Sequence, residues 1–304
     1  MEKWDINNIP DQQERVALIT GANSGLGFQV SLALARKGAD IILACRNLEK
    51  AEKAVEFIRK ESPDTKLSVL KLDLSDLDSV SECAEKIKEK YTVINLLINN
   101  AGIMVPPFSR TKQGFELQFG TNHLGHFALV GKLLPLINHV SGSRIVSVSS
   151  IAASLNYINF NDLNYEHKHY RKWQAYGQSK LANQMFMREL AKRLEENDSE
   201  TISVAAHPGV SSTDLFNNSG IVGKLSSLIS QSPEKGALSI LRASCDPQIQ
   251  NGSYWGPSGL FKFKGNPEQT KLESKALDSK LTKRLWEISE KLTGVSYHFG
   301  RCNG

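Results

Sequence analysis

Short apolar segments alternate with longer amphipathic segments along most of the chain, and this alternation limits the fold more than any other feature. The apolar segments are rich in Val, Ile and Leu and lack polar alternation, which is typical of strands covered on both faces. Six of them occupy residues 15–20, 40–45, 66–73, 94–100, 144–150 and 202–209. The pattern predicts a parallel sheet, because parallel strands are joined by crossover segments of this length.

The amphipathic segments are the predicted helices, and they cover residues 25–37, 48–61, 76–90, 117–138 and 175–195. A seventh strand is expected near residues 252–257 and a final helix near residues 279–292. Right-handed crossovers restrict how such units wind, so we predict an α/β fold with one doubly wound parallel sheet, a Rossmann fold, and helices on both faces. No linker divides the chain, so residues 1–304 are predicted to be one domain with an N-terminal extension over residues 1–14.

Composition and charge limit the partners of the chain. The 37 basic and 32 acidic residues give a net charge of +5 and are spread along the sequence, which favours solubility over nucleic-acid binding. The N-terminus lacks the pattern of a signal peptide, and no apolar run approaches the roughly 18 residues that a membrane helix needs. The sequence therefore predicts a cytoplasmic protein without a membrane anchor. No metal is predicted, because the four cysteines form no CxxC pair and His167 and His169 lack further ligands at matching spacing.

Three connections are longer than usual and follow the carboxyl ends of predicted strands. They cover residues 104–114, 154–175 and 211–235. Open α/β sheets bind ligands at this edge, and long loops in compact domains are often functional. We expect residues 211–235 to form the substrate loop, while the alternative for all three segments is ordinary surface loop.

The first predicted strand runs through a glycine-rich turn, Thr20 to Gly27, straight into a helix. Glycines suit a backbone that must turn sharply and approach a pyrophosphate, and a helix N-terminus offers free N–H groups to an anion. In this strand–turn–helix context the turn predicts dinucleotide binding. The expected contacts of this turn are Gly21, Asn23, Ser24, Gly25, Leu26 and Gly27.

The end of the second strand indicates which dinucleotide is bound. A fold that binds NAD would place an acidic residue here to hold the ribose 2′-hydroxyl. This chain has Ala44-Cys45-Arg46-Asn47 instead, and the guanidinium of Arg46 is well shaped to hold a 2′-phosphate. The sequence therefore predicts NADP(H) in preference to NAD(H). The alternative is that Arg46 is a solvated residue at a strand end.

Tyr176 and Lys180 lie four residues apart in the predicted helix over residues 175–195, so they share one helix face. A phenol with an ordinary pKa near 10 is a poor acid–base group at neutral pH. A neighbouring ammonium favours the phenolate, so we expect Lys180 to lower the pKa of Tyr176. A surface pair at this spacing is the plain alternative.

Taken together, these motifs resemble those of the short-chain dehydrogenase/reductase family. The matching elements are Thr20 to Gly27, Asn99-Asn100-Ala101-Gly102, Ser150, and Tyr176 with Lys180. Finer details are similar to the retinol-dehydrogenase-like branch, namely Ala44 to Asn47, residues 123–127 and residues 179–183. The resemblance runs from about Arg15 to Thr213. Ser150 and Tyr176 are 26 residues apart, roughly double the usual family interval, and an insertion around residues 154–170 accounts for this.

The resemblance implies a catalytic set of Asn122, Ser150, Tyr176 and Lys180. Tyr176 would be the general acid in carbonyl reduction, and Lys180 would lower its pKa and hydrogen-bond the nicotinamide ribose. Ser150 would hold the oxygen on which negative charge develops, with neighbouring Ser149 as the competing assignment. Asn122 would hold a water that links Lys180 to solvent, or act only in hydrogen bonding within its helix.

The resemblance also implies further cofactor contacts along the chain. Asp73 and Leu74 would lie at the adenine, and the Asn100 to Gly102 stretch beside the ribose. Pro208, Gly209 and Thr213 would hold the nicotinamide carboxamide. Together with the glycine turn and Arg46, the cofactor set therefore includes Asp73, Leu74, Asn100, Ala101, Gly102, Tyr176, Lys180, Pro208, Gly209 and Thr213.

The expected activity is interconversion of a small hydrophobic alcohol and its aldehyde or ketone. The segments that would wall the substrate site, residues 104–108, the insertion and residues 215–229, are rich in apolar side chains. The alternative is an NADP-binding regulator or scaffold without turnover, since one fold serves many functions. Neither a G-x-S-x-G elbow nor a Walker loop occurs, which argues against a serine hydrolase and against a nucleotide phosphatase. The resemblance leaves a homo-oligomer and a monomer both open.

Overall fold

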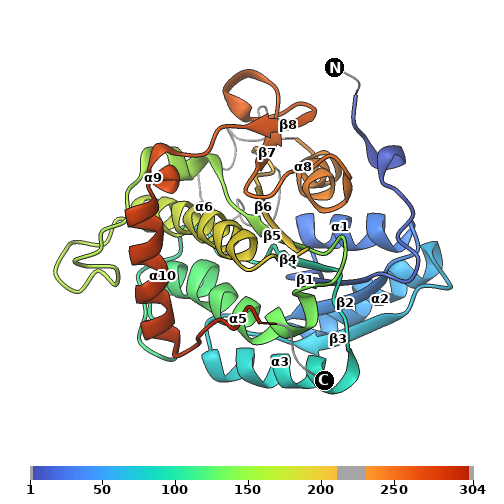
Figure 1. The fold of residues 1–304 in the computed structure, drawn as a ribbon, viewed down its shortest axis with the longest axis horizontal. Coiled ribbons are helices and arrows are strands. Elements are labelled where there is room, and N and C mark those ends of the chain that lie inside the picture. Colours follow the sequence, from blue (N-terminus) through green and yellow to red (C-terminus); the bar gives the residue numbers. More distant parts are fainter. Residues whose placement is uncertain (1–2, 211–230, 301–304) are drawn as a thin grey trace.

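The computed structural model describes residues 3–210 and 231–300, and its centre is an eight-stranded sheet (Figure 1). The strand order is β3-β2-β1-β4-β5-β6-β7-β8. The strands are β1 (Val16–Thr20), β2 (Asp40–Cys45), β3 (Leu67–Lys71), β4 (Leu96–Asn99), β5 (Arg144–Val148), β6 (Ile202–Ala206), β7 (Tyr254–Pro257) and β8 (Pro267–Thr270). The order of the strands reverses at β1, since β2 and β3 lie on one side of it and β4 to β7 on the other. This is the doubly wound arrangement, so the predicted fold class is confirmed.

One edge of the sheet differs from the prediction. β8 pairs antiparallel with β7, with Tyr254 opposite Thr270, whereas the pairs from β3 to β7 are all parallel. The expectation of a wholly parallel sheet is therefore wrong at this edge. β8 has the sequence PEQT, which is short, polar and begins with proline, and edge strands tolerate such residues.

Helices cover both faces of the sheet (Figure 1). One face packs against α1 (Gly25–Ala35), α2 (Leu48–Glu61) and α8 (Pro233–Cys245). The other packs against α3 (Leu77–Lys90), α5 (Gly125–Ile137) and α6 (Lys172–Glu196), with α10 (Ser279–Thr293) packed on α6. Adjacent strand residues such as Leu18 and Ile19 are fully buried on opposite faces, which explains why the strands show no polar alternation.

The predicted helix over residues 117–138 is broken into three parts. It consists of α4 (Leu117–Phe119), a π-helical turn (Gly120–Leu124) and α5, and the turn carries Asn122. A β-carbon on Gly125 would lie 2.4 Å from the carbonyl oxygen of Leu74, so glycine lets α5 approach the segment after β3. Such π-turns are frequent at functional sites.

The N-terminal extension is packed onto the domain. Trp4 and Ile9 are buried in the same core as α1, and the backbone N–H of Gln12 donates to the carbonyl of Lys37. Among residues 3–210 and 231–300, no helix has the length and hydropathy needed to cross a bilayer.

Candidate active site

The glycine turn is fixed by Thr20 at the end of β1. The Thr20 hydroxyl accepts the backbone N–H groups of Asn100 and Ala101 at 3.0 and 2.9 Å, and the Asn100 amide donates to the Thr20 carbonyl. Gly21 has a φ of +66°, where a side chain would be strained. A β-carbon on Gly27 would lie 2.3 Å from the Gly21 carbonyl oxygen, so the turn closes only with glycine there. The structure thus joins the turn after β1 to the Asn-Asn-Ala-Gly stretch after β4.

A cavity of about 500 Å³ opens above this junction, at the carboxyl ends of the strands. Twelve predicted cofactor residues line it: Gly21, Asn23, Ser24, Gly25, Leu26, Gly27, Arg46, Asp73, Leu74, Asn100, Ala101 and Gly102. Other lining residues were not predicted, among them Lys50, Ile103, Met104 and Thr121. A β-carbon on Gly102 would lie 3.3 Å from the Lys180 ammonium, so that ammonium adjoins the cavity. The cavity volume falls within the range of about 300–1,000 Å³ typical of ligand pockets, and its lining glycines suit the approach of a pyrophosphate.

Two cations lie at the β2 end of this cavity. Arg46 precedes Asn47, the N-cap of α2, whose side chain accepts the backbone N–H of Lys50. Glu49 is paired with Lys53 at 2.7 Å and does not line the cavity. Asp73 is the acidic residue among the described lining residues. The sequence signal for Lys50 was its place in the first helical turn, four residues after Arg46.

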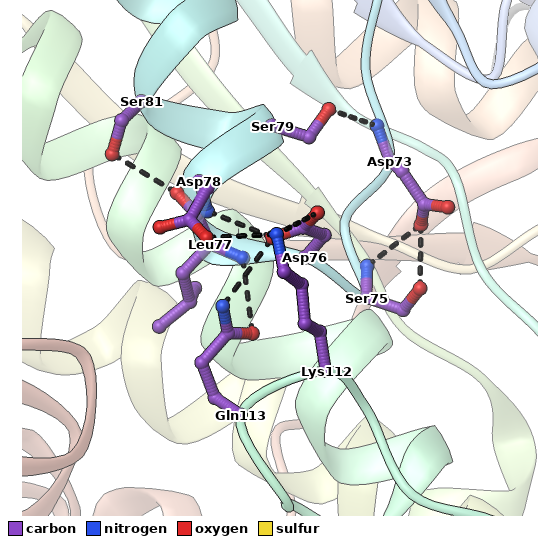
Figure 2. Close-up of polar contacts among 9 residues, drawn as sticks. All are labelled: Asp73, Ser75, Asp76, Leu77, Asp78, Ser79, Ser81, Lys112 and Gln113. Atoms are coloured by element: carbon purple, nitrogen blue, oxygen red, sulfur yellow. Dashed lines mark hydrogen bonds and ion pairs between the residues drawn. The ribbon is translucent and has the colours of Figure 1, made fainter.

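Asp73 is held at the end of β3 by the residues that start α3 (Figure 2). Its carboxylate accepts the backbone N–H and the hydroxyl of Ser75, and its own N–H donates to the Ser79 hydroxyl. Lys112 pairs with Asp76 and Asp78 in the same cluster, which ties the loop after β4 to the N-terminus of α3 (Figure 2). Asp73, which is expected to contact the adenine, and the loop after β4 are therefore both held at the N-terminus of α3.

Tyr176, Lys180 and Ser150 come together between α6 and the end of β5. The Ser150 hydroxyl lies close enough to the Tyr176 phenol to lower its pKa, and the Lys180 ammonium donates to the Val148 carbonyl at 3.1 Å. Tyr176 and Lys180 are buried, with 8% and 4% of their surfaces exposed, and Ser150 is partly buried. Buried hydroxyl and ammonium groups beside a dinucleotide-sized cavity can bind an oxygen atom and move a proton to it.

The acidity of these two groups differs from the expectation. Burial raises the pKa of Tyr176 to about 12, which outweighs the lowering effect of the Ser150 hydrogen bond. Burial likewise lowers the pKa of Lys180 to about 8. The predicted lowering of the phenol pKa by Lys180 is therefore wrong for this arrangement. The ammonium lies 5.8 Å from the centre of the Tyr176 ring, and desolvation disfavours the phenolate.

The two candidate serines point to different partners. The Ser149 hydroxyl donates to the backbone carbonyl of Lys180 and accepts from the Gln184 amide, so it braces α6 against β5. The Ser150 hydroxyl faces Tyr176 and also accepts the backbone N–H of Ala152 at the start of a 3₁₀-helix (Ile151–Leu155). Ser150 rather than Ser149 therefore lies beside the phenol, and its expected oxygen-binding role stays a prediction.

Asn122 connects the π-turn to the wall of the cavity. Its side-chain oxygen accepts the N–H of Ile103, and its two amide hydrogens go to the Ile103 carbonyl and the Ser179 hydroxyl. Its backbone carbonyl contacts the buried ring of His126, which also reaches the Thr20 hydroxyl at 2.9 Å. Asn122 thus positions the loop after β4, and its expected water-binding role stays a prediction.

The predicted nicotinamide contacts lie at the end of β6. Gly209 has a φ of +68°, and a β-carbon there would lie 2.2 Å from the Phe263 carbonyl oxygen. The Pro208 carbonyl accepts the Gln231 amide. Thr213 and most of the predicted substrate loop, residues 211–230, lie outside the described residues. The last three residues of the predicted loop, 233–235, begin α8.

The insertion over residues 154–170 is held by hydrogen bonds within itself and to α6. The Asp162 carboxylate accepts three backbone N–H groups, from Glu166, His167 and Lys168. The Gln178 side chain accepts the N–H of Asn159, which ties the insertion to α6. Within the described parts of the chain, no three His, Cys, Asp or Glu residues gather as metal ligands would.

Known proteins resemble the chain in sequence and in structure. A family model described as short chain dehydrogenase matches residues 15–221, a range that includes the glycine turn and the Tyr176–Lys180 pair. Retinol dehydrogenase 13 from Homo sapiens is 39% identical over 292 residues, covering 92% of this chain and 85% of that protein. An uncharacterised oxidoreductase from Schizosaccharomyces pombe is 40% identical over 272 residues, covering 83% and 80%. The solved structure of an uncharacterised protein from Mycobacterium paratuberculosis has 37% identity, a TM-score of 0.83, and coverage of 98% of this chain and 100% of that chain.

Proposed function

Because the chain belongs to the short-chain dehydrogenase family and is an alcohol/carbonyl oxidoreductase of its retinol-dehydrogenase-like kind, we propose that it uses NADP(H) and acts on hydrophobic substrates. The observation that carries the chemistry is the contact between the Ser150 hydroxyl and the buried Tyr176 phenol, one helical turn from Lys180. This group of residues adjoins the cavity of about 500 Å³ that the glycine turn lines.

The cofactor would be held by residues at three strand ends. The backbone of Gly25 to Gly27 would hold the pyrophosphate, and the Asn100 to Gly102 segment would contact the nicotinamide half. When bound, the nicotinamide would accept or supply a hydride. Arg46 and Lys50 support NADP(H), because a 2′-phosphate there would meet two cations, whereas NAD(H) would leave them without an anion.

Tyr176 would act as the proton donor during carbonyl reduction. With a pKa of about 12 the phenol stays protonated at neutral pH, so its proton is available to the carbonyl oxygen. Ser150 would bind the same oxygen and stabilise the negative charge that develops on it. Lys180, charged below its pKa of about 8, would hydrogen-bond the nicotinamide ribose, the role that the family resemblance implies.

A hydrophobic substrate is supported by the walls of the site and by the relatives. Ile103 and Met104 line the cavity beside Gly102, and the loop continues into Val105, Pro106 and Pro107. Relatives named retinol dehydrogenase 12, 13 and 14, which are 36–39% identical to the chain, point to apolar alcohols and aldehydes. The cytoplasmic location and the oligomeric state stay predictions.

The decisive experiment mixes purified protein with NADPH and a panel of aldehydes and ketones, and follows the loss of NADPH absorbance. We expect turnover in the wild type and a loss of at least about 100-fold in Tyr176→Phe, in line with removing a general acid. Tyr157→Phe is the matched control, because Tyr157 is an exposed tyrosine in the insertion. NADPH binding without turnover on the whole panel would contradict the proposal and favour a regulator or scaffold.

A further inference from the structure

A second cavity, of about 390 Å³, lies next to the start of α6, and we name it the outer cavity. Its volume falls in the range of about 300–1,000 Å³ that is typical of ligand pockets. Two segments form its walls, the loop after β4 and the residues that lead into α6. The lining residues are Pro106, Pro107, Tyr170, Arg171, Lys172 and Trp173.

Both walls of the outer cavity continue into the candidate active site. Trp173 lies one helical turn before Tyr176 on α6, and their rings meet edge to face with centres 6.4 Å apart. On the other wall, Met104 lines the cofactor cavity and Pro106, two residues later, lines the outer cavity. A molecule with its reacting carbon at Tyr176 could therefore extend along one continuous surface into the outer cavity.

The loop wall has a strained backbone between these two cavities. Val105 is buried and has a φ of +50°, a region that β-branched residues rarely adopt. Such strain persists only where the surroundings enforce it, and it gathers at functional sites. The N–H of Val105 donates to the side-chain oxygen of Gln118 at 2.9 Å, so Gln118 supports the kink that turns Pro106 away from Met104.

Gln118 holds the other wall as well. Its amide nitrogen donates to the Tyr170 hydroxyl at 2.8 Å and to the Lys172 carbonyl at 2.9 Å. The side chain is fully buried, and its oxygen accepts one hydrogen bond while both of its N–H groups donate. One residue therefore sets the distance between the Pro106–Pro107 wall and the Trp173 wall.

A buried carboxylate completes this support. The Glu116 side chain caps α4 by accepting the N–H groups of Gln118 and Phe119, and it also accepts the Tyr170 hydroxyl at 3.1 Å. The Tyr170 ring packs between Tyr165 and Phe108, with centres 5.2 and 5.1 Å away. Fully bonded buried polar groups are rigid, so the outer cavity has a fixed shape before any ligand enters.

We propose that the outer cavity is a substrate subsite for an elongated apolar aldehyde or alcohol, and that Gln118 is a positioning residue that fixes its walls. The apolar end remote from the reacting carbon would lie between Trp173 and the two prolines. Trp173 is 43% exposed, so a ligand there would remove a large aromatic surface from water. This inference rests on the proposed redox function of the adjoining site.

The first test compares kcat/KM with NADPH for straight-chain aldehydes from propanal to decanal. In the wild type we expect an increase of about threefold to fourfold for each added methylene that becomes buried. In Trp173→Ala we expect propanal to react within about twofold of the wild type, while decanal loses about tenfold or more. Phe57→Ala removes a similarly exposed aromatic side chain on α2 and is expected to leave the series unchanged. A series that is flat in the wild type would overturn the subsite.

The second test addresses Gln118. Gln118→Met keeps the length of the side chain but removes its hydrogen bonds to Val105, Tyr170 and Lys172. We expect KM for decanal to rise by about tenfold while kcat for propanal stays within about twofold. An equal loss for both aldehydes would overturn the positioning role, since it would indicate general destabilisation. Gln248→Met, at an exposed position, is the matched control.

A third measurement separates the subsite from the redox chemistry. Trp4, Trp255 and Trp286 are buried, so acrylamide quenching of fluorescence reports mainly on Trp173. We expect decanol to protect the wild type from quenching, and Trp173→Phe to abolish the effect. Protection without turnover of any carbonyl would support the subsite and contradict the redox proposal. Turnover without protection would overturn the subsite and leave the redox proposal standing.

Discussion

Lys180 is a buried cation, so its charge opposes folding while the proposed chemistry uses it. Burial lowers its pKa from 10.5 to about 8, so the unfolded chain binds this proton more tightly than the folded protein does. Its charged form therefore destabilises the fold below about pH 8, and the penalty disappears as the pH rises from about 8 to 10.5. Function here is maintained at a cost in stability.

We predict that Lys180→Met stabilises the protein at pH 7 by about 1–3 kcal/mol and abolishes turnover. The Val148 carbonyl keeps a partner in the variant, because the Asn183 amide also donates to it. Urea unfolding of both proteins at pH 7 and pH 10 measures the effect, and the gain should shrink at the higher pH. A variant that unfolds at lower urea than the wild type at pH 7 would contradict this account.

The side chains of Arg46 and Lys50 are expected to determine the preference for NADPH over NADH. Each charge-assisted contact to a phosphate contributes about 1.5–3 kcal/mol, so we predict that Arg46→Ala lowers the NADPH-to-NADH ratio of kcat/KM by about 10- to 100-fold. Lys50→Ala should lower the same ratio by a smaller factor, because a lysine ammonium is a point charge and lacks the two-pronged contact that arginine makes with a phosphate. Lys53→Ala is the control, because Lys53 pairs with Glu49 on the same helix. An unchanged ratio in both variants would refute the assignment.

At the scale of elements, the contact between α6 and the 3₁₀-helix at Ile151–Leu155 holds Ser150 against Tyr176. Gly177 makes this approach possible, because a β-carbon there would lie 1.8 Å from the Asn156 amide nitrogen and 2.6 Å from the Ala152 carbonyl oxygen. The two elements therefore cannot keep their present distance with any larger residue at this position.

We predict that Gly177→Ala destabilises the fold by about 1–3 kcal/mol, the usual cost of overpacking, and lowers kcat by separating the two hydroxyls. Chemical denaturation and steady-state kinetics measure the two effects. Adding Asn156→Ala removes the nearest side-chain atoms and should restore part of both. If the single variant keeps wild-type stability and kcat, the contact does not position Ser150.

At the scale of the whole molecule, buried neutral histidines make the free energy of unfolding depend on pH. Burial lowers the pKa of His123 to about 3, and that of His126 and His207 to about 4, from 6.5. The unfolded chain takes up these protons near pH 6.5 and the folded protein only near pH 3–4. The three neutral histidines therefore contribute fully to the free energy of unfolding above about pH 6.5. This contribution is lost progressively as the pH falls from about 6.5 towards 3–4.

We therefore predict that the free energy of unfolding decreases from pH 7 to pH 4.5 by several kcal/mol, at about 1–3 kcal/mol for each histidine. Urea unfolding at stepped pH values measures this slope. His123→Phe should flatten it, because its ring sits among Phe119, Phe127 and Phe186 and would no longer titrate. A slope that is unchanged in this variant would contradict the assignment to His123.

The sequence by itself determined the parts of the protein that depend on local patterns. Apolar segments without polar alternation predicted the strands from β1 to β6, because strands buried on both faces need apolar residues on both sides. The glycine turn predicted the cofactor cavity, since only glycine allows the close approaches at Gly21 and Gly27. The helical period placed Tyr176 and Lys180 on one face of α6.

Only the tertiary structure decided what depends on packing between distant segments. The sequence favours Ser150 over Ser149 only through the family resemblance. In the structure, the Ser149 hydroxyl donates to the Lys180 carbonyl on α6, whereas the Ser150 hydroxyl faces the Tyr176 phenol. The pKa of Tyr176 rises because the folded protein buries the phenol, and this outweighs any effect of Lys180 one helical turn away. The spacing of residues along the sequence does not reveal such burial. The outer cavity exists because Gln118 joins residues 13 and 54 positions away. Local periodicity is written along the chain, whereas desolvation and long-range hydrogen bonds arise only when the chain has folded.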